Sequence, residues 1–328
     1  MTTRTIERAL GIPAWGLLVA LMTTALLVAA ALPAVAAGDA FPVTVVDDEG
    51  TEVTVEAYPE RIISLSPANT ETVYALGAGD RLVGGTDYDD YPPEAAEVTD
   101  VATFTGVIME QVVALEPDLV LAAGNGLTKP GEIATMRELG YPVVVLYAPD
   151  VDTVMADIEI IGATVGAAEE ARAMTAQLNA QMEVVAAEAA AAGVTPRVFY
   201  ELDATSEIFA PAPDSFVADM IVRAGGEPIT TGDPALWSIP LEELVVADPE
   251  IIILGDANYG TCPDDVAARP GWDGMTAVVD GNVRPVDDVP ITRPGPRLAQ
   301  GLASLARAIH PELELAEFPA DPPMCDEA

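Results

Sequence analysis

Cations are scarce in this sequence. Of its 328 residues only 14 are lysine or arginine, against 53 aspartates and glutamates, and Lys129 is the one lysine. The formal net charge of −39 makes nucleic acid and anionic membrane surfaces poor partners, because both are bound through clustered cations. Salt screens the self-repulsion of so acidic a chain, which is consistent with a salty habitat. An ordinary acidic exported protein from a GC-rich genome accounts for the charge equally well.

Histidine and the usual catalytic motifs are also missing. His310 is the single histidine, whereas a zinc or manganese binder needs several imidazoles, so we expect His310 only to pack or cap at a helix end. The chain has no Gly-x-Ser-x-Gly elbow, no phosphate loop ending in Gly-Lys-Ser/Thr and no Cys-x-x-Cys pair. We therefore predict that the protein is not an enzyme. A hydrolase on a two-lobed α/β scaffold is the less favoured alternative.

The first 36 residues have the pattern of an export signal peptide. Arg4 and Arg8 precede an apolar run over residues 14–32, and Ala34-Val35-Ala36 then forms a small-residue cleavage pattern. No cysteine lies near this junction to carry a lipid. We expect a periplasmic or secreted protein after removal of the signal peptide. An uncleaved membrane anchor is the alternative, because the run is about long enough to span a bilayer.

The chain has two cysteines, Cys262 and Cys325. Disulfides persist in exported proteins, so these two are a disulfide candidate that would tie down the acidic tail. Two unpaired thiols are the alternative.

Short apolar β-branched runs alternate with helical stretches, which is typical of parallel sheets covered by helices. The expected strands are residues 61–66, 82–86, 119–123, 143–147 and 197–201, and the expected helices are residues 70–76, 109–115, 131–139, 151–166 and 167–192. We predict an N-terminal α/β lobe over residues 37–150, a helical connector over 151–195, a C-terminal α/β lobe over 196–313 and an acidic tail over 314–328. The connector includes one long linking helix, so lobe closure should be small.

An internal repeat supports two similar lobes. Residues 109–121 (MEQVVALEPDLVL) reappear as residues 241–253 (LEELVVADPEIII). Each copy predicts a short helix with glutamate in its first turn, a proline that prevents the helix from continuing, and a buried strand. Because ligands bind beyond the carboxyl ends of such strands, two facing lobes would form one cleft.

Several stretches carry a family resemblance: residues 61–71 (RIISLSPANTE), 77–80 (GAGD), 86–93 (TDYDDYPP), 224–227 (AGGE) and 293–297 (RPGPR). Over residues 59–311 the chain resembles the cobalamin-type periplasmic binding proteins, which belong to the helix-linked class III of substrate-binding proteins of ABC importers. The resemblance implies an α/β fold of two Rossmann-like lobes with mostly parallel sheets, joined by a single long helix. It also implies a monomer without a cofactor that captures a corrinoid, cobalamin or cobinamide, and delivers it to a permease dimer with its ATPase subunits.

The resemblance further implies site residues. One exposed glutamate on each lobe would meet arginines of the permease, and Glu71 and Glu242 match these positions; without the resemblance, each simply complements the positive end of its helix. The positions expected to contact the ligand are Tyr88, Tyr91, Phe104, Phe209, Trp237, Asp288 and Arg293.

Alternatives remain open at these positions. Any one of the aromatics could instead be core, and Arg293 could brace a turn. Residues 122–126 (AAGNG) lack the tryptophan found there in a close corrinoid-binding relative. A ferric siderophore or haem is therefore the alternative ligand, with haem held through Tyr88 or Tyr91.

Overall fold

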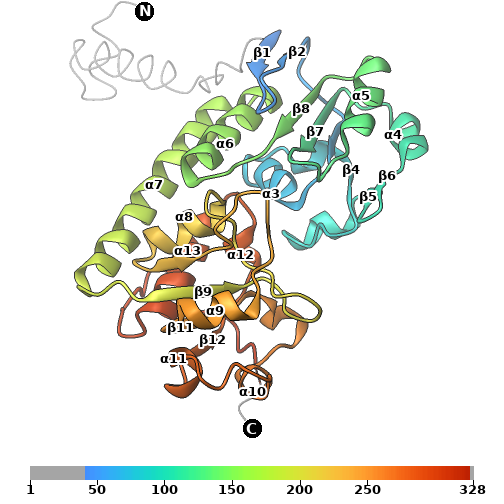
Figure 1. Ribbon diagram of the computed structural model, residues 1–328. Coiled ribbons are helices and arrows are strands. Elements are labelled where there is room, and N and C mark those ends of the chain that lie inside the picture. Colours follow the sequence, from blue (N-terminus) through green and yellow to red (C-terminus); the bar gives the residue numbers. More distant parts are fainter. Residues whose placement is uncertain (1–40, 326–328) are drawn as a thin grey trace, which may run out of the picture. The chain divides into compact units, whose positions relative to one another are not determined.

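The structure, a computed structural model of the chain, describes residues 41–325 (Figure 1). The predicted signal peptide over residues 1–36, its cleavage and the last three residues of the predicted tail lie outside this range. Residues 41–325 lie within one compact unit, so the two predicted lobes are in close mutual contact.

The N-terminal lobe is built on a six-stranded sheet of order β6-β5-β4-β3-β7-β8. Its neighbouring strands are parallel except β5 and β6, which are antiparallel. The strands are β3 (Ile62–Ser64), β4 (Leu82–Thr86), β5 (Asp100–Thr103), β6 (Gly106–Val107), β7 (Leu119–Ala123) and β8 (Val143–Leu146). The helices are α3 (Pro67–Ala75), α4 (Met109–Leu115) and α5 (Pro130–Glu138), with 3-10 turns η1 (Gly79–Arg81) and η2 (Pro93–Glu97). Every residue of β7 and β8 is buried, as expected for strands covered on both faces.

A small hairpin that the sequence pattern did not predict precedes this sheet. It pairs β1 (Val43–Val46) with β2 (Glu52–Val55) in antiparallel register. The turn is held to β8, because the backbone N–H of Asp48 donates to the carbonyl of Val145 at 3.0 Å. The buried Asp47 also accepts a hydrogen bond from Arg137 at 2.8 Å.

The C-terminal lobe has a four-stranded, fully parallel sheet of order β10-β9-β11-β12. The strands are β9 (Arg197–Glu201), β10 (Glu227–Ile229), β11 (Ile251–Leu254) and β12 (Val283–Pro285). The helices are α8 (Phe216–Arg223), α9 (Leu241–Ala247), α10 (Pro263–Ala267), α11 (Thr276–Val279), α12 (Val289–Thr292) and α13 (Leu298–Ile309), with the 3-10 turn η3 (Gly255–Tyr259). The predicted α/β class with two mostly parallel sheets is confirmed.

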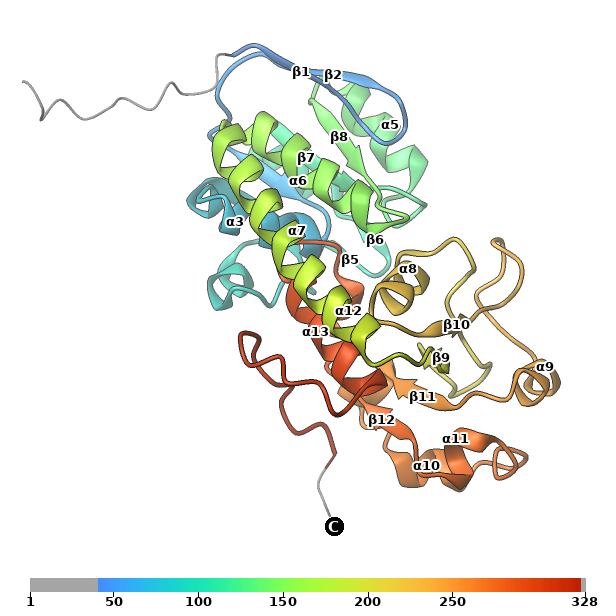
Figure 2. The ribbon, with the colours of Figure 1, turned by 90° about the vertical axis from the view of Figure 1, so that its left-hand side faces the viewer.

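Two helices carry the chain from the first sheet to the second (Figures 1 and 2). The helix α6 (Val151–Val165) begins where the Asp150 side chain accepts from the backbone N–H of Thr153, and it ends at Gly166, whose φ of 74° is readily adopted by glycine. The helix α7 (Ala168–Ala191) has 24 residues and is about 36 Å long. It contacts both α6 and α13, and its buried residues form one stripe along the helix, from Ala171 to Ala189. No helix in residues 41–325 is long and apolar enough to cross a membrane.

The internal repeat folds as two matching units, α4–β7 and α9–β11. Each helix ends in a left-handed residue just before the proline: Glu116 has a φ of 45° and Asp248 a φ of 46°. An arginine at or beside the start of the neighbouring strand then bonds the end of each helix. The Nε of Arg61 donates to the carbonyl of Leu115 at 2.7 Å, and the Nε of Arg197 donates to that of Ala247 at 3.2 Å. The repeat therefore includes the arginine hydrogen bonds that hold each helix against its sheet.

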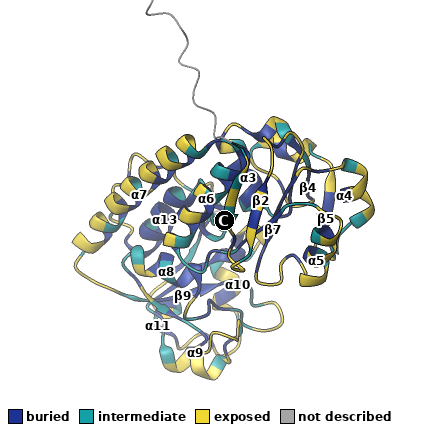
Figure 3. Ribbon diagram, turned by 90° about the horizontal axis from the view of Figure 1, so that it is seen from above, coloured by how far each residue is buried: buried dark blue, intermediate teal, exposed yellow. Residues whose placement is uncertain are grey.

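One cluster of buried apolar side chains runs through both lobes. It includes Ile62 of β3, Ile158 of α6, Leu178 of α7, Leu302 of α13 and Ile253 of β11. In Figure 3, α13 is mostly buried, whereas α6 and α7 each have a buried face and an exposed face. Burial of apolar area stabilises by about 25 cal/mol per Å², so wide separation of the lobes would be costly.

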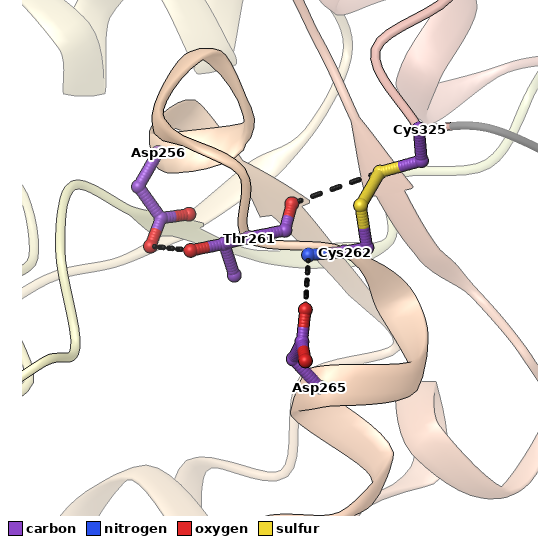
Figure 4. Close-up of a disulfide and its surroundings, with 5 residues drawn as sticks. All are labelled: Asp256, Thr261, Cys262, Asp265 and Cys325. Atoms are coloured by element: carbon purple, nitrogen blue, oxygen red, sulfur yellow. Dashed lines mark hydrogen bonds between the residues drawn. A yellow bond between two sulfur atoms is a disulfide. The ribbon is translucent and has the colours of Figure 1, made fainter.

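A disulfide joins Cys262, at the start of α10, to Cys325 near the C-terminus (Figure 4). The backbone N–H of Cys262 donates to Asp265 at 2.9 Å, and the hydroxyl of the preceding Thr261 donates to Asp256 at 2.7 Å. The bond spans 63 residues of sequence and ties the tail to the C-terminal lobe.

Reducing this disulfide should lower the free energy of unfolding by about 4 kcal/mol, because a long loop is no longer closed in the unfolded chain. Chemical unfolding with and without a thiol reductant measures the difference. The double variant Cys262→Ser/Cys325→Ser is the control and should not respond to the reductant. An equal unfolding midpoint for the wild type in both conditions would contradict this expectation.

Candidate ligand-binding site

Two adjoining pockets open at the carboxyl ends of the strands. The first, here called the inter-lobe pocket, has a volume of about 360 Å³, and the second, the N-lobe pocket, a volume of about 540 Å³. Both are lined by Ser66, Pro67, Ala123, Leu127 and Arg293, so they share a wall and form one continuous site. Parallel α/β sheets place ligands at this edge.

The inter-lobe pocket takes its walls from both lobes and from the connector. Leu146 ends β8 and Tyr147 follows it in the N-terminal lobe, and Phe216 and Trp237 come from the C-terminal lobe. Its lining is mainly apolar and aromatic, which suits a large, partly apolar ligand. Trp237, one of the predicted contact residues, is among the residues that line this pocket.

The N-lobe pocket presents Tyr88 and Phe104, two of the predicted aromatics, which are 53% and 88% exposed. The loop that carries Tyr88 is held by the buried carboxylate of Asp89. Asp89 accepts from the hydroxyl of Thr70 at 2.8 Å and from the backbone N–H of Thr86 at 3.0 Å, and burial raises its pKa. The aromatic surface is thus positioned by a polar network beneath it.

A buried carboxylate links the two lobes at the edge of the site. Glu71 on α3 accepts from Arg297 through Nε at 2.8 Å and through Nη2 at 2.6 Å, and from Nη1 of Arg293 at 3.1 Å. Arg293 also donates to Asp90 at 2.5 Å, and although partial burial opposes it, this arginine holds the pKa of Asp90 below its usual value. Both arginines lie next to α12 and α13, so this network, the Glu71 cluster, joins the lobes.

The Glu71 cluster corrects one prediction. Glu71 was expected as an exposed residue for docking the permease, but it is only 3% exposed. Its side chain is used inside the protein, because two arginines of the other lobe already bind both carboxylate oxygens. Glu242 is different: it is exposed in the first turn of α9, as the docking prediction requires.

Three other predicted contact residues line neither pocket. Tyr91 lies under the guanidinium of Arg297, 4.2 Å from ring centroid to Cζ. Phe209 forms backbone bridges in the C-terminal lobe. Asp288 accepts from the hydroxyl of Tyr200 at 2.6 Å, and burial raises its pKa. Tyr91 and Asp288 thus use their side chains in contacts within the protein, whereas the predicted Arg293 both lines the pockets and pairs internally.

The sequence reasoning missed the contribution of α6, which was treated only as a connector. Asp157, Ile158 and Ile161 of this helix line the inter-lobe pocket, and Leu127 lines both pockets. A signal was present, because Asp157 lies at helical spacing from the apolar Val154 and Ile161 and is itself buried.

Within residues 41–325 no group of three or more potential metal ligands comes together. His310 caps the end of α13 and is 2% exposed, which confirms its predicted role in helix-end packing.

Comparison with known proteins identifies the family. The periplasmic binding protein family matches residues 62–290. This chain belongs to that family. A substrate-binding lipoprotein of an ABC transporter, YvrC of Bacillus subtilis, is 31% identical over 278 residues, covering 84% of this chain and 87% of the relative. A cobalamin-binding protein of Halobacterium salinarum is 31% identical over 282 residues, covering 82% and 74%.

Solved structures of the same fold bind different ligands. The vitamin B12 binding protein BtuF of Vibrio cholerae matches with a TM-score of 0.68 at 25% identity, covering 77% of this chain and 97% of that one. The heme-binding protein RhuT of Roseiflexus matches with the same TM-score and identity, covering 77% and 98%. A periplasmic binding protein of this kind is the ligand-capturing component of an ABC importer and works outside the cytoplasmic membrane with a permease and its ATPase subunits.

The variant Glu71→Gln should destabilise this periplasmic binding protein by about 3 kcal/mol, because two partly buried arginines lose their shared charge partner. Chemical unfolding measures the loss. The control is Glu110→Gln, an exposed first-turn glutamate of α4, which should stay within about 0.5 kcal/mol of the wild type. Equal stabilities of the two variants would show that the Glu71 cluster does not hold the lobes together.

Proposed function

We propose that this periplasmic binding protein captures a corrinoid, cobalamin or cobinamide, in the two adjoining pockets and delivers it to the permease of an ABC importer. The proposal rests on the chemistry of the residues that line the two pockets. Its walls are apolar and aromatic, and its cations are already neutralised: Lys129 pairs with Glu132 at 3.5 Å, and Arg293 pairs with Glu71 and Asp90.

A corrinoid fits such a site because it is broad, partly apolar and edged by neutral amides. A haem or a ferric siderophore with free carboxylates would bring negative charge to a protein with a net charge of −39, without an unpaired arginine or lysine among the cations that line the two pockets. The cobalamin-binding relative from Halobacterium salinarum and the structural match to BtuF support the same choice.

Haem is the second candidate, favoured by the exposed Tyr88 in the N-lobe pocket, since tyrosine can ligate haem iron. The structural match to RhuT supports it as well.

Absorbance titration of the purified protein with cyanocobalamin, dicyanocobinamide, haem and ferric siderophores distinguishes these ligands. We expect a corrinoid to bind with a Kd of about 1 μM or tighter. Trp237→Ala should weaken this binding by about tenfold, because a large aromatic wall of the pocket is lost. Tyr259→Ala is the control, since Tyr259 is 88% exposed on η3 and lines neither pocket. If haem is the only ligand that saturates the protein, the proposed corrinoid ligand is wrong, whereas the proposed transport role stands.

The variant Glu242→Ala should leave ligand affinity unchanged and impair uptake. A rim charge lost from the docking surface costs about 1 kcal/mol, or about fivefold in affinity for the permease. Ligand titration and uptake into proteoliposomes holding the partner importer separate the two effects. Glu243→Ala changes the neighbouring exposed glutamate of α9 and serves as the control. If Glu242→Ala lost ligand affinity without a transport defect, the assignment of Glu242 to the docking surface would be wrong.

A further inference from the structure

A buried acid lines the inter-lobe pocket on the connector side. Asp157 of α6 is 8% exposed, and within residues 41–325 its Oδ1 has no hydrogen-bond partner. The apolar Ile158 and Ile161 of the same helix, and Phe216 of the C-terminal lobe, also line this pocket. A buried polar atom without a partner costs free energy, so a position serving only stability would favour an apolar side chain.

The charged groups near Asp157 do not neutralise it. Asp48 of the β1–β2 turn and Asp150 at the start of α6 are both acids. Arg293 lines the same pocket, but it is engaged by Glu71 and Asp90. Burial is the main cause that raises the pKa of Asp157 to about 8, and the nearby Asp48 carboxylate, which is hydrogen-bonded to Asp157, adds to it, so the side chain is a neutral acid at neutral pH.

The proton of the neutral Asp157 is shared with Asp48 in a side-chain hydrogen bond, so its Oδ1 is left as an acceptor without a partner. A primary amide of the ligand can donate a hydrogen bond to this oxygen. A carboxylate on the ligand offers only acceptors and would bring a negative charge towards three acids.

We propose that Asp157 is a specificity residue of the inter-lobe pocket that selects ligands whose edge groups are amides over ligands whose edge groups are carboxylates. This inference rests on the proposed corrinoid-binding function and identifies the edge groups of the ligand as the part that the pocket recognises.

Three corrinoids with one macrocycle test the proposal at neutral pH: dicyanocobinamide with amide edges, the heptamethyl ester of dicyanocobyrinic acid, and the free heptacarboxylic acid. Wild-type affinity should fall in this order. Asp157→Leu should bind the amide ligand about fivefold more weakly, because a hydrogen bond is lost, and should bind the ester as the wild type does. Asp157→Asn should bind the heptacarboxylic acid about fivefold more tightly, because its amide donates to a carboxylate.

The control is Asp152→Asn, which makes the same change on the exposed side of α6, where Asp152 pairs with Arg223 at 3.2 Å. It should leave the ratio of amide to carboxylate affinities at the wild-type value. Circular dichroism tests whether each variant is folded. If Asp157→Leu does not fold, the affinities of Asp157→Asn alone test the proposal.

The outcomes separate this inference from the proposed function. If dicyanocobinamide binds the wild type and both Asp157 variants keep the wild-type ratio of amide to carboxylate affinities, Asp157 only partners Asp48, and this inference alone is overturned. If no corrinoid binds the wild type while haem does, the proposed function is overturned together with it.

Discussion

The buried carboxylate of Glu71 is the contact on which the arrangement of the site depends. It lies on the first helix of the N-terminal lobe and is bonded by Arg293 and Arg297 of the C-terminal lobe. Removing one partner of such a cluster leaves an uncompensated charge, so the two lobes are held at one spacing. The same Arg293 forms a wall shared by both pockets, and the ligand site is therefore built around an interaction that belongs to the fold.

The connector adds a second constraint on the same spacing. The helices α6 and α7 bring apolar side chains into a cluster that includes strands of both lobes. A ligand enters a site that is largely formed beforehand, because opening the lobes widely would expose this cluster to water. The connector is also part of the site, since Asp157, Ile158 and Ile161 of α6 line the inter-lobe pocket.

The net charge of the whole chain differs from the charge at the ligand site. The chain as a whole is strongly acidic, with 53 acids against 14 lysines and arginines. Several of the few arginines are placed where they neutralise buried acids: at the edge of the site in the Glu71 cluster, and elsewhere in the C-terminal lobe in the bidentate pair between Arg269 and Glu201. The site is consequently close to neutral inside an acidic protein, and this contrast favours an uncharged ligand over an anionic one.

The sequence alone determined the fold class, the two lobes, the helical connector and the internal repeat. It also located the ends of elements such as α4, β7 and β9, because local signals such as Pro117 and the β-branched strands act over a few residues. It identified Trp237, Tyr88 and Phe104 as pocket residues.

Only the tertiary structure decided that Glu71 is buried, that Tyr91 lies under Arg297 and that Asp157 faces the pocket. Glu71 and Arg297 are 226 residues apart, and no local pattern encodes such a pairing. The carboxylate of a glutamate on a helix is equally suited to solvent and to a buried arginine, and the packing of distant elements chooses between them.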